Sequence, residues 1–367
     1  MSSDKLTVLI SPTHRCNMRC DYCYVSDTSY GDMSIFDFKA AYTWLIKYCN
    51  FLDIKFIDFT WFGGEPLLYG EANLENALNE QRRCFEGSDI KFINRLQSNL
   101  TLVNEKICFL IKEYFDGFIG GSFEPYGLAR KYVNGRNAAI DIERAIDYLH
   151  TKDIRVGIVS TLIKNDLQPP QKLYDWYSKH VDMFRVNRAH SPDGKRLEQY
   201  LTVDEYNDYV IALFDLYTRE REVSFKFTNF AAIARSILLK RPFCCTDVNE
   251  PYWKLSICGN GAILSYCRKF DMSIGNYYFS APQDIIEAYK RKHDQIVLNV
   301  CRECDSYINN ICSGSCWGEP NKNCHESCCG YRSEYTLETI SYVQQYLQLN
   351  EIESFEDCYS KKISKIL

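Results

Sequence analysis

The chain has 367 residues, of which 46% are hydrophobic and 25% charged, and its formal net charge is −5. These proportions are ordinary for a folded globular protein, and the negative charge does not favour general nucleic-acid binding. No apolar stretch is long enough to span a bilayer, and the polar segment before the first predicted strand is too short for a signal peptide. We therefore expect a cytoplasmic protein without nucleic-acid or membrane partners.

The first half of the chain alternates between strand-like and helix-like segments. The predicted strands are Leu6–Ser11, Lys55–Trp61, Lys91–Gln97, Gly117–Ser122, Arg155–Thr161 and Met183–Asn187. The predicted helices are Ser34–Cys49, Glu71–Phe85, Asn104–Tyr114, Asn137–Thr151 and Gln171–Lys179, with Ser34 and Asn104 as N-caps. Six strands separated by helices predict an α/β fold with a parallel sheet, a partial (β/α)6 TIM-like barrel. Binding sites in such sheets lie at the carboxyl ends of the strands.

The second half of the chain has a different pattern. Thr202–Arg219 is predicted to be a bridging helix, and Asn260-Gly261 predicts a hairpin turn between short strands. Thr336–Leu349 predicts a last amphipathic helix. We therefore divide the chain into an α/β core with the bridging helix (1–235), a cysteine-rich domain (236–350) and a tail (351–367).

Cysteine is unusually frequent, with 18 residues distributed unevenly. Three lie in one loop after the first predicted strand, and twelve lie between Cys244 and Cys358. In a chain without an export signal, such clusters are more often metal ligands than disulfides. The remaining three, Cys49, Cys84 and Cys108, lie in predicted helices and are interpreted as buried small hydrophobic residues.

The first cysteine loop has a spacing with a chemical meaning. Cys16, Cys20 and Cys23 form a C-x3-C-x2-C pattern. Three thiolates at this spacing can hold three irons of a [4Fe–4S] cluster, which leaves the fourth iron open for chemistry. The sequence therefore predicts a reactive cluster at the carboxyl end of the first strand.

This loop, with Tyr22 directly before its third cysteine, resembles the radical S-adenosylmethionine (radical SAM) enzymes. The resemblance implies that the open iron binds S-adenosylmethionine and that Tyr22 packs near the adenine. It also implies that one-electron reduction cleaves the cofactor to methionine and a 5′-deoxyadenosyl radical, which abstracts a hydrogen from the substrate.

Further motifs of the same family follow at later strand ends. Gly63-Gly64-Glu65-Pro66 resembles the turn that lines the methionine amino group, because glycines permit close backbone approach. Gln97-Ser98-Asn99 resembles the family's Gln-Thr-Asn. Gly120-Gly121-Ser122-Phe123-Glu124 resembles its fourth-strand pattern, with Ser122 as a contact to the ribose or carboxylate, although Glu124 replaces the usual Asp and Pro125 the usual Gly. The resemblance also implies that Arg130 pairs with the methionine carboxylate, with Arg136 as a competitor, and that Ser160 and Thr161 lie near the adenine.

The later cysteines resemble those of SPASM domains, which carry two auxiliary [4Fe–4S] clusters. The resemblance rests on the hairpin that ends at Cys267, followed by Ile274-Gly275-Asn276. It implies that the nearer cluster is held by Cys267, Cys316 and two of Cys244, Cys245 and Cys258, with Cys245 and Cys258 preferred. It implies that the farther one is held by Cys301, Cys304, Cys312 and one of Cys324, Cys328 and Cys329, with Cys328 preferred. A structural zinc site is the alternative for this set.

The resemblance implies a peptide-modifying enzyme acting on a ribosomally made precursor, by oxidation, thioether or carbon–carbon crosslinking, or excision. The implied partners are a peptide or protein substrate and an electron donor such as flavodoxin or ferredoxin. Because little chain precedes Leu6, we expect a leader peptide to be read by a separate leader-binding protein or by another surface. Arg188, His190 and Arg268 are candidates for the substrate cavity.

The general base remains unassigned. Anaerobic sulfatase-maturing enzymes have an Asp where this chain has Arg268, and a guanidinium cannot act as a base. Asp271 lies nearby in the sequence but at a different position. Formylglycine formation therefore stays an alternative, together with a small-molecule radical SAM dehydrogenase and a non-catalytic iron–sulfur or zinc scaffold.

Overall fold

The computed structural model describes residues 5–23, 30–189, 198–220, 224–240, 253–265, 273–296, 335–354 and 357. Several predicted positions lie outside these residues: His190, Arg268, Asp271 and every cysteine between Cys244 and Cys358 except Cys258. Of the predicted auxiliary-cluster ligands, Cys258 alone therefore lies within the described ranges.

A single sheet organises the described part of the chain. Its strand order is β10-β9-β8-β1-β2-β3-β4-β5-β6-β7, and all neighbours from β8 to β7 are parallel. β9 and β10 continue the sheet in antiparallel fashion. The strands are β1 (Lys5–Ile10), β2 (Phe56–Trp61), β3 (Lys91–Ser98), β4 (Phe118–Ser122), β5 (Arg155–Leu162), β6 (Met183–Arg188), β7 (Lys226–Phe227), β8 (Lys254–Ile257), β9 (Ala262–Ser265) and β10 (Ser273–Asn276).

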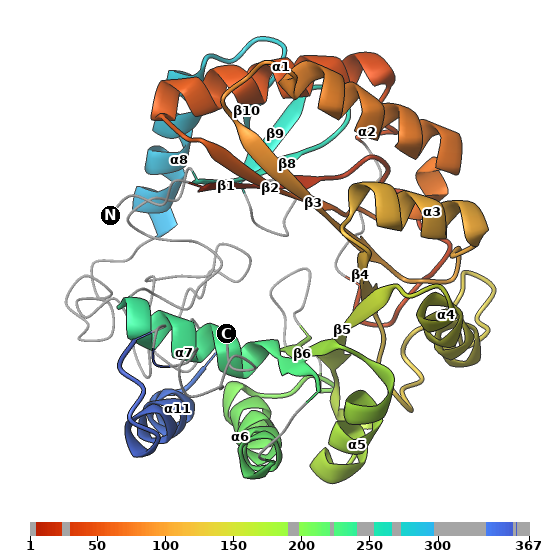
Figure 1. The fold of residues 1–367 in the computed structure, drawn as a ribbon, viewed down its shortest axis with the longest axis vertical. Coiled ribbons are helices and arrows are strands. Elements are labelled where there is room, and N and C mark those ends of the chain that lie inside the picture. Colours follow the sequence, from red (N-terminus) through yellow and green to blue (C-terminus); the bar gives the residue numbers. More distant parts are fainter. Residues whose placement is uncertain are drawn as a thin grey trace.

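Helices cover the outer side of this curved sheet (Figure 1). Because β8 and β1 to β7 are parallel, their carboxyl ends share one rim. They are α1 (Ile35–Leu52), α2 (Glu71–Phe85), α3 (Glu105–Tyr114), α4 (Ala139–Thr151), α5 (Pro170–His180), α6 (Val203–Arg219), α7 (Thr228–Leu239), α8 (Pro282–Ile296) and α11 (Leu337–Leu349), with short 3-10 turns η1 (Pro66–Tyr69) and η2 (Lys164–Asp166). The predicted α/β fold with a parallel sheet is confirmed.

The core lies between the sheet and these helices and is rich in aromatic side chains. Phe38 and Tyr42 of α1 pack against Trp61 and Phe59 of β2, with ring centroids 5.6 and 6.2 Å apart respectively. All four side chains are fully buried. Burial of such large apolar groups is the main favourable term in folding, and it fixes the βα units that carry the rim.

Two predicted N-caps are confirmed. Ser34 forms a capping box with Asp37 at the start of α1, and the Asn104 side chain accepts a hydrogen bond from the Ile107 amide at the start of α3. Cys49 and Cys108 are buried within helices and Cys84 is half-buried, in agreement with their interpretation as packing residues.

The segments after the bridging helix join the core directly. The predicted turn at Asn260-Gly261 is present, with positive φ at both residues, and joins β8 to β9. β8 pairs in parallel with β1, from Thr7 opposite Lys254 to Ile10 opposite Ile257. This pairing was not predicted, because a contact between strands so distant in sequence leaves no local signal.

Three further elements were not predicted: β7, α7 and α8. β7 has only two residues, too short for a recognisable alternation.

α11 packs against α6 and α7 and is fixed by Asn207, whose side-chain oxygen accepts hydrogen bonds from the Thr336 amide (2.9 Å) and the Thr339 hydroxyl (2.6 Å). Among the described residues, no helix has the length and apolarity needed to cross a bilayer.

Candidate functional site

The cysteine loop leaves β1 at the rim formed by the carboxyl ends of the strands. Cys16 and Cys20 are half-buried, Cys23 is exposed, and the Cys23 amide donates to the Cys20 carbonyl (3.0 Å). Burial raises the pKa of the Cys16 thiol and raises that of Cys20 to about 11. Both pKa shifts also include repulsion from Cys23, so the three sulfurs lie close together.

The glycine turn after β2 supports the back of this loop. The Gly64 amide donates to the Thr13 carbonyl (3.1 Å), and the Glu65 amide donates to the Arg15 carbonyl (2.8 Å). A Cβ on Gly64 would lie 2.3 Å from the Arg15 carbonyl oxygen, and one on Gly63 would lie 2.4 Å from that of Thr13. The close contact between the two loops therefore requires glycine at both positions, for steric reasons that do not depend on a ligand.

The Glu65 side chain is bonded within the protein. Its side chain is buried, and its carboxylate accepts hydrogen bonds from the amides of Leu67 (3.0 Å) and Asn99 (2.6 Å) and from the Ser98 hydroxyl (2.8 Å). Burial raises its pKa in spite of these bonds. The Glu65 side chain thus joins the glycine turn to the end of β3, and Pro66 begins η1 as a buried residue. The contact of this turn with the methionine amino group stays a prediction.

An amide network contacts Cys16 from the end of β3. The Asn99 side-chain nitrogen donates to Asn17 (2.8 Å) and lies 4.0 Å from the Cys16 sulfur. The Asn17 nitrogen in turn donates to the Thr101 hydroxyl (2.9 Å). Sequence reasoning singled out Asn99 within a family motif but missed Asn17 and Thr101, because a contact between the loops after β1 and β3 leaves no local signal.

A second segment clamps the opposite side of the loop. The Arg19 amide donates to the Lys131 carbonyl (2.8 Å), and the Asp21 amide donates to the Ala129 carbonyl (3.0 Å). The Lys131 ammonium also pairs with the Asp21 carboxylate (2.8 Å). These antiparallel contacts were not predicted, because irregular backbone pairing has no sequence period.

Arg130 lies in this clamp and is almost wholly buried. Its guanidinium binds Glu124 through Nε (3.0 Å) and Nη2 (3.1 Å), donates to the Tyr22 hydroxyl (2.5 Å) and lies 3.7 Å from the Cys20 sulfur. Burial alone would lower the pKa of Arg130, but the adjacent Glu124 more than compensates, so the charge is retained. Burial also raises the pKa of Tyr22, which stays neutral at physiological pH.

The two predicted serine contacts differ. Ser122, at the end of β4, accepts a hydrogen bond from the Gln97 side chain (2.9 Å) and stays at the rim. Ser160 is fully buried, with its hydroxyl between the Phe123 carbonyl and the hydroxyl of Tyr177 on α5. Since side chains alternate along a strand, Ser160 faces the outer helices, whereas the neighbouring Thr161 faces the other way. The Ser160 hydroxyl is thus used within the protein, and its place near the adenine stays a prediction.

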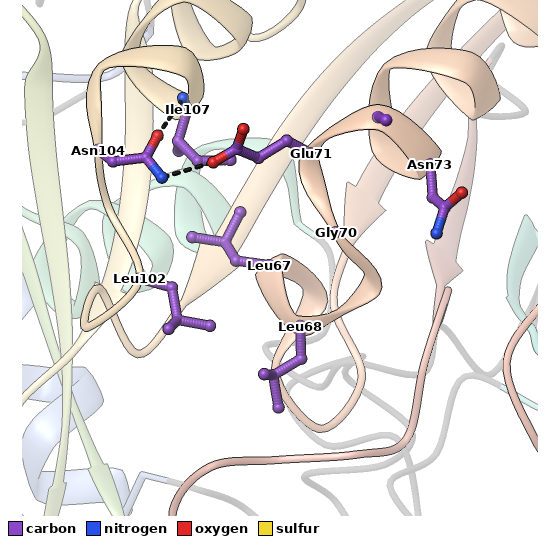
Figure 2. A pocket seen from close by; sticks show the side chains of 9 residues that line it. Leu67, Leu68, Gly70, Glu71, Asn73, Leu102, Asn104 and Ile107 are labelled. Carbon is purple, nitrogen blue, oxygen red and sulfur yellow. Dashed lines mark hydrogen bonds between the residues drawn. The ribbon is translucent and has the colours of Figure 1, made fainter.

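One described cavity lies apart from these residues. It is an open cavity of about 520 Å³ between η1, the start of α2 and the start of α3. Figure 2 shows Leu67, Leu68 and Leu102 on its wall, with the Asn104 side chain bonded to both Glu71 and the Ile107 amide. No cysteine lines it, so it is not the predicted cofactor site.

Comparison with known proteins identifies this rim. Residues 10–176, from the end of β1 into α5, match the model of the radical SAM superfamily. Residues 10–176 thus correspond to a radical SAM domain. Its first cysteine loop, glycine turn and Arg130 clamp all fall within the matched residues.

Two curated relatives match most of the chain, including residues outside the radical SAM domain. An uncharacterized protein of Synechocystis is 23% identical over 363 residues, which cover 91% of this chain and 90% of the relative. A serine-type anaerobic sulfatase-maturating enzyme of Bacteroides thetaiotaomicron is 20% identical over 353 residues, which cover 85% and 82%.

Two solved structures share the fold. anSMEcpe with bound AdoMet and the Cp18Cys peptide has a TM-score of 0.74 at 21% identity, covering 94% of this chain and 97% of that one. Streptococcus suis SuiB bound to the precursor peptide SuiA has a TM-score of 0.60 at 15% identity, covering 86% and 72%.

The radical SAM cysteine loop fits a cluster better than a single metal ion. In the part of the chain that the structure describes, no three His, Cys, Asp or Glu side chains converge as ligands of one ion. In a [4Fe–4S] cube each thiolate binds a different iron, so three ligand sulfurs need not meet at one point. None of the seven described cysteines forms a disulfide. Cys16, Cys20 and Cys23 are thus available to hold a cluster.

Cys258 is the one predicted auxiliary-cluster ligand that the structure describes. It follows β8, is fully buried, and packs with Ala262, Leu264 and Tyr30. Burial raises its pKa to about 12. Because β8 lies beside β1, Cys258 is near the beginning of the radical SAM cysteine loop.

Proposed function

We propose that this chain is a radical SAM enzyme that modifies a peptide, with its reactive [4Fe–4S] cluster on Cys16, Cys20 and Cys23. One observation carries the proposal: the cysteine loop sits at the strand rim of a radical SAM domain, fixed from both sides by the glycine turn and the Arg130 clamp. Rigid support of this kind is what a cluster site with one open iron requires.

The cluster and its bound S-adenosylmethionine would supply a 5′-deoxyadenosyl radical after one-electron reduction by a flavodoxin or ferredoxin. The residues of the rim would hold the cofactor. Tyr22 would pack against the adenine, the carbonyls of Gly63 and Gly64 would accept the methionine ammonium hydrogens, and Ser122 would contact the ribose or carboxylate. Two auxiliary clusters would lie in residues 236–350, as a SPASM domain.

A peptide substrate is favoured by the proteins that this chain resembles. anSMEcpe and SuiB were both solved with peptides, and the Bacteroides relative is named as a maturating enzyme. We propose a ribosomally made precursor as substrate in the cytoplasm, presented with the help of a separate leader-binding protein. The outcome would be oxidation, a thioether or carbon–carbon crosslink, or excision.

Co-expression with a short peptide encoded beside the enzyme tests this proposal by mass spectrometry. Loss of hydrogen atoms from the peptide indicates oxidation or crosslinking, and loss of a residue mass indicates excision. The Cys20→Ala variant, which lacks one cluster ligand, should leave the peptide unchanged. An unmodified peptide together with a modified low-mass metabolite would favour a small-molecule dehydrogenase instead.

A further inference from the structure

Cys20 and Arg130 lie directly opposite each other in the described structure. The backbone pairs Arg19 with Lys131 and Asp21 with Ala129, and an antiparallel bridge joins Met18 to Tyr132. In an antiparallel pair, residues that face each other carry their side chains on the same side, about 5 Å apart. The Arg130 guanidinium is accordingly 3.7 Å from the Cys20 sulfur.

The donors of Arg130 are nearly all used within the protein. Nε and Nη2 bind the two carboxylate oxygens of Glu124, and Nη2 also donates to Tyr22. Nη1 donates to Cys20, which leaves one of the five guanidinium hydrogens. A two-point contact to a ligand carboxylate needs two parallel N–H groups. Arg130 has only one N–H group left, because Glu124, Tyr22 and Cys20 take the other four.

Glu124 is fixed as firmly as Arg130. Its Oε1 atom also accepts a hydrogen bond from the Thr161 amide (2.9 Å), and only 7% of its side chain is exposed. The Glu124 side chain spans from the end of β4 to the guanidinium. The pair is therefore an ionic unit with its positive end toward Cys20.

We propose that Arg130 is a positioning residue for Cys20, held by Glu124 and Tyr22, and that it raises the reduction potential of the cluster instead of binding the methionine carboxylate. The inference rests on the proposed function, since it needs a cluster on Cys20. A hydrogen bond and a positive charge at a ligand sulfur stabilise the reduced, more negative cluster. Glu124 partly cancels that charge.

The two partners should thus have opposite effects on the potential. Removing the donor in Arg130→Gln lowers it, whereas removing the compensating charge in Glu124→Gln raises it. We expect at least a tenfold change in the reduction equilibrium in each case, about 59 mV for one electron. A role in folding alone would not move the two variants in opposite directions.

The measurement is an anaerobic redox titration of the reconstituted full chain, followed by electron paramagnetic resonance. The relevant cluster is recognised because its spectrum changes on addition of S-adenosylmethionine, which auxiliary clusters with four protein ligands should not do. Affinity for S-adenosylmethionine is measured in parallel by equilibrium dialysis. Arg136→Gln is the matched control. Arg136 lies six residues after Arg130, is exposed, and pairs with Asp141 of α4.

Opposite shifts, with the affinity for S-adenosylmethionine changed by less than about tenfold, support the inference. An Arg130→Gln variant that loses the cofactor but keeps its potential would overturn it, as would shifts in the same direction. If Arg130→Gln assembles no cluster, Glu124→Gln decides: an upward shift supports the inference and any other result overturns it. If no cluster of the unchanged protein alters its spectrum on addition of S-adenosylmethionine, the proposed function is contradicted as well. If such a cluster is present but its reduction potential is the same in both variants, this inference alone is contradicted.

Discussion

At the scale of single residues, the side chains around the cysteine loop contact one another: the Arg130 guanidinium lies against both Cys20 and Tyr22. Cys16, Cys20, Tyr22 and Arg130 were predicted and lie together. Glu65 and Ser160 were also predicted, but both side chains are directed into the protein. A motif gives the position of a residue along the chain, whereas the direction of its side chain depends on contacts with distant segments.

Gly64 allows a test of how the cysteine loop is supported. In Gly64→Ala the new Cβ would lie 2.3 Å from the Arg15 carbonyl and 2.4 Å from that of His14, both backbone atoms that cannot rotate away. The loop must shift, so we expect loss of at least one ligand position and at most a small fraction of normal cluster content. Iron analysis and visible absorption after anaerobic reconstitution measure this.

Gly135→Ala is the control for that variant. It lies in the Arg130 segment with φ of +85°, and a Cβ there meets no atom within 4 Å. It carries a backbone cost of about 1 kcal/mol without a collision. Normal cluster content in Gly64→Ala, equal to that of the control, would refute the structural role given to this glycine.

At the scale of elements, local signals were sufficient for the βα units. Apolar runs bounded by turns predicted β1 to β6, and cap residues such as Ser34 predicted helix starts. The pairing of β8 with β1 could not be predicted, because it joins segments that lie far apart in the sequence. The strand β7 could not be predicted because its two residues are too few to show a periodic pattern.

Asp37 connects α1 to the turn after β10. Its carboxylate accepts hydrogen bonds from Ser34 at the helix cap and from the hydroxyls of Tyr277 (3.0 Å) and Tyr278 (2.8 Å). Burial alone would raise its pKa, but these bonds outweigh it and hold the pKa below the ordinary value. Its stabilising effect is therefore full above the unfolded-state pKa of about 4 and is lost as pH falls through the lower, folded-state value.

We expect Asp37→Asn to destabilise the protein by about 1 kcal/mol at pH 7, with a smaller difference from the unchanged protein at pH 3. Thermal unfolding followed by circular dichroism at both pH values measures this. Asp116→Asn is the control, because the Asp116 side chain is 99% exposed and its ion pair with Arg155 contributes little. A difference that grows at low pH would refute the assignment.

At the scale of the whole molecule, the region after residue 236 extends the core sheet through β8, β9 and β10. Trp44 of α1 donates to the Ser280 carbonyl (2.8 Å), which fixes this region to the first helix. The domain that we propose for the auxiliary clusters would thus be attached to the strand that carries the radical SAM cysteine loop. Electron transfer between clusters would be helped by such a rigid connection.

Cys258 tests the auxiliary clusters. If it is a ligand, Cys258→Ala should lower the iron content of the reconstituted protein by about four atoms per chain. Cys49→Ala is the matched control, since Cys49 is equally buried and its pKa is also raised to about 12 by burial. Equal iron contents in the two variants would show that Cys258 is only a packing residue.

The central claim is that the loop of Cys16, Cys20 and Cys23 holds a cluster that cleaves S-adenosylmethionine. The most direct measurement is 5′-deoxyadenosine formation by the anaerobically reconstituted and reduced protein, quantified by liquid chromatography. We predict formation by the unchanged protein and by Cys49→Ala, and none by Cys16→Ala, Cys20→Ala or Cys23→Ala. Formation at an undiminished rate in these three variants would contradict the account.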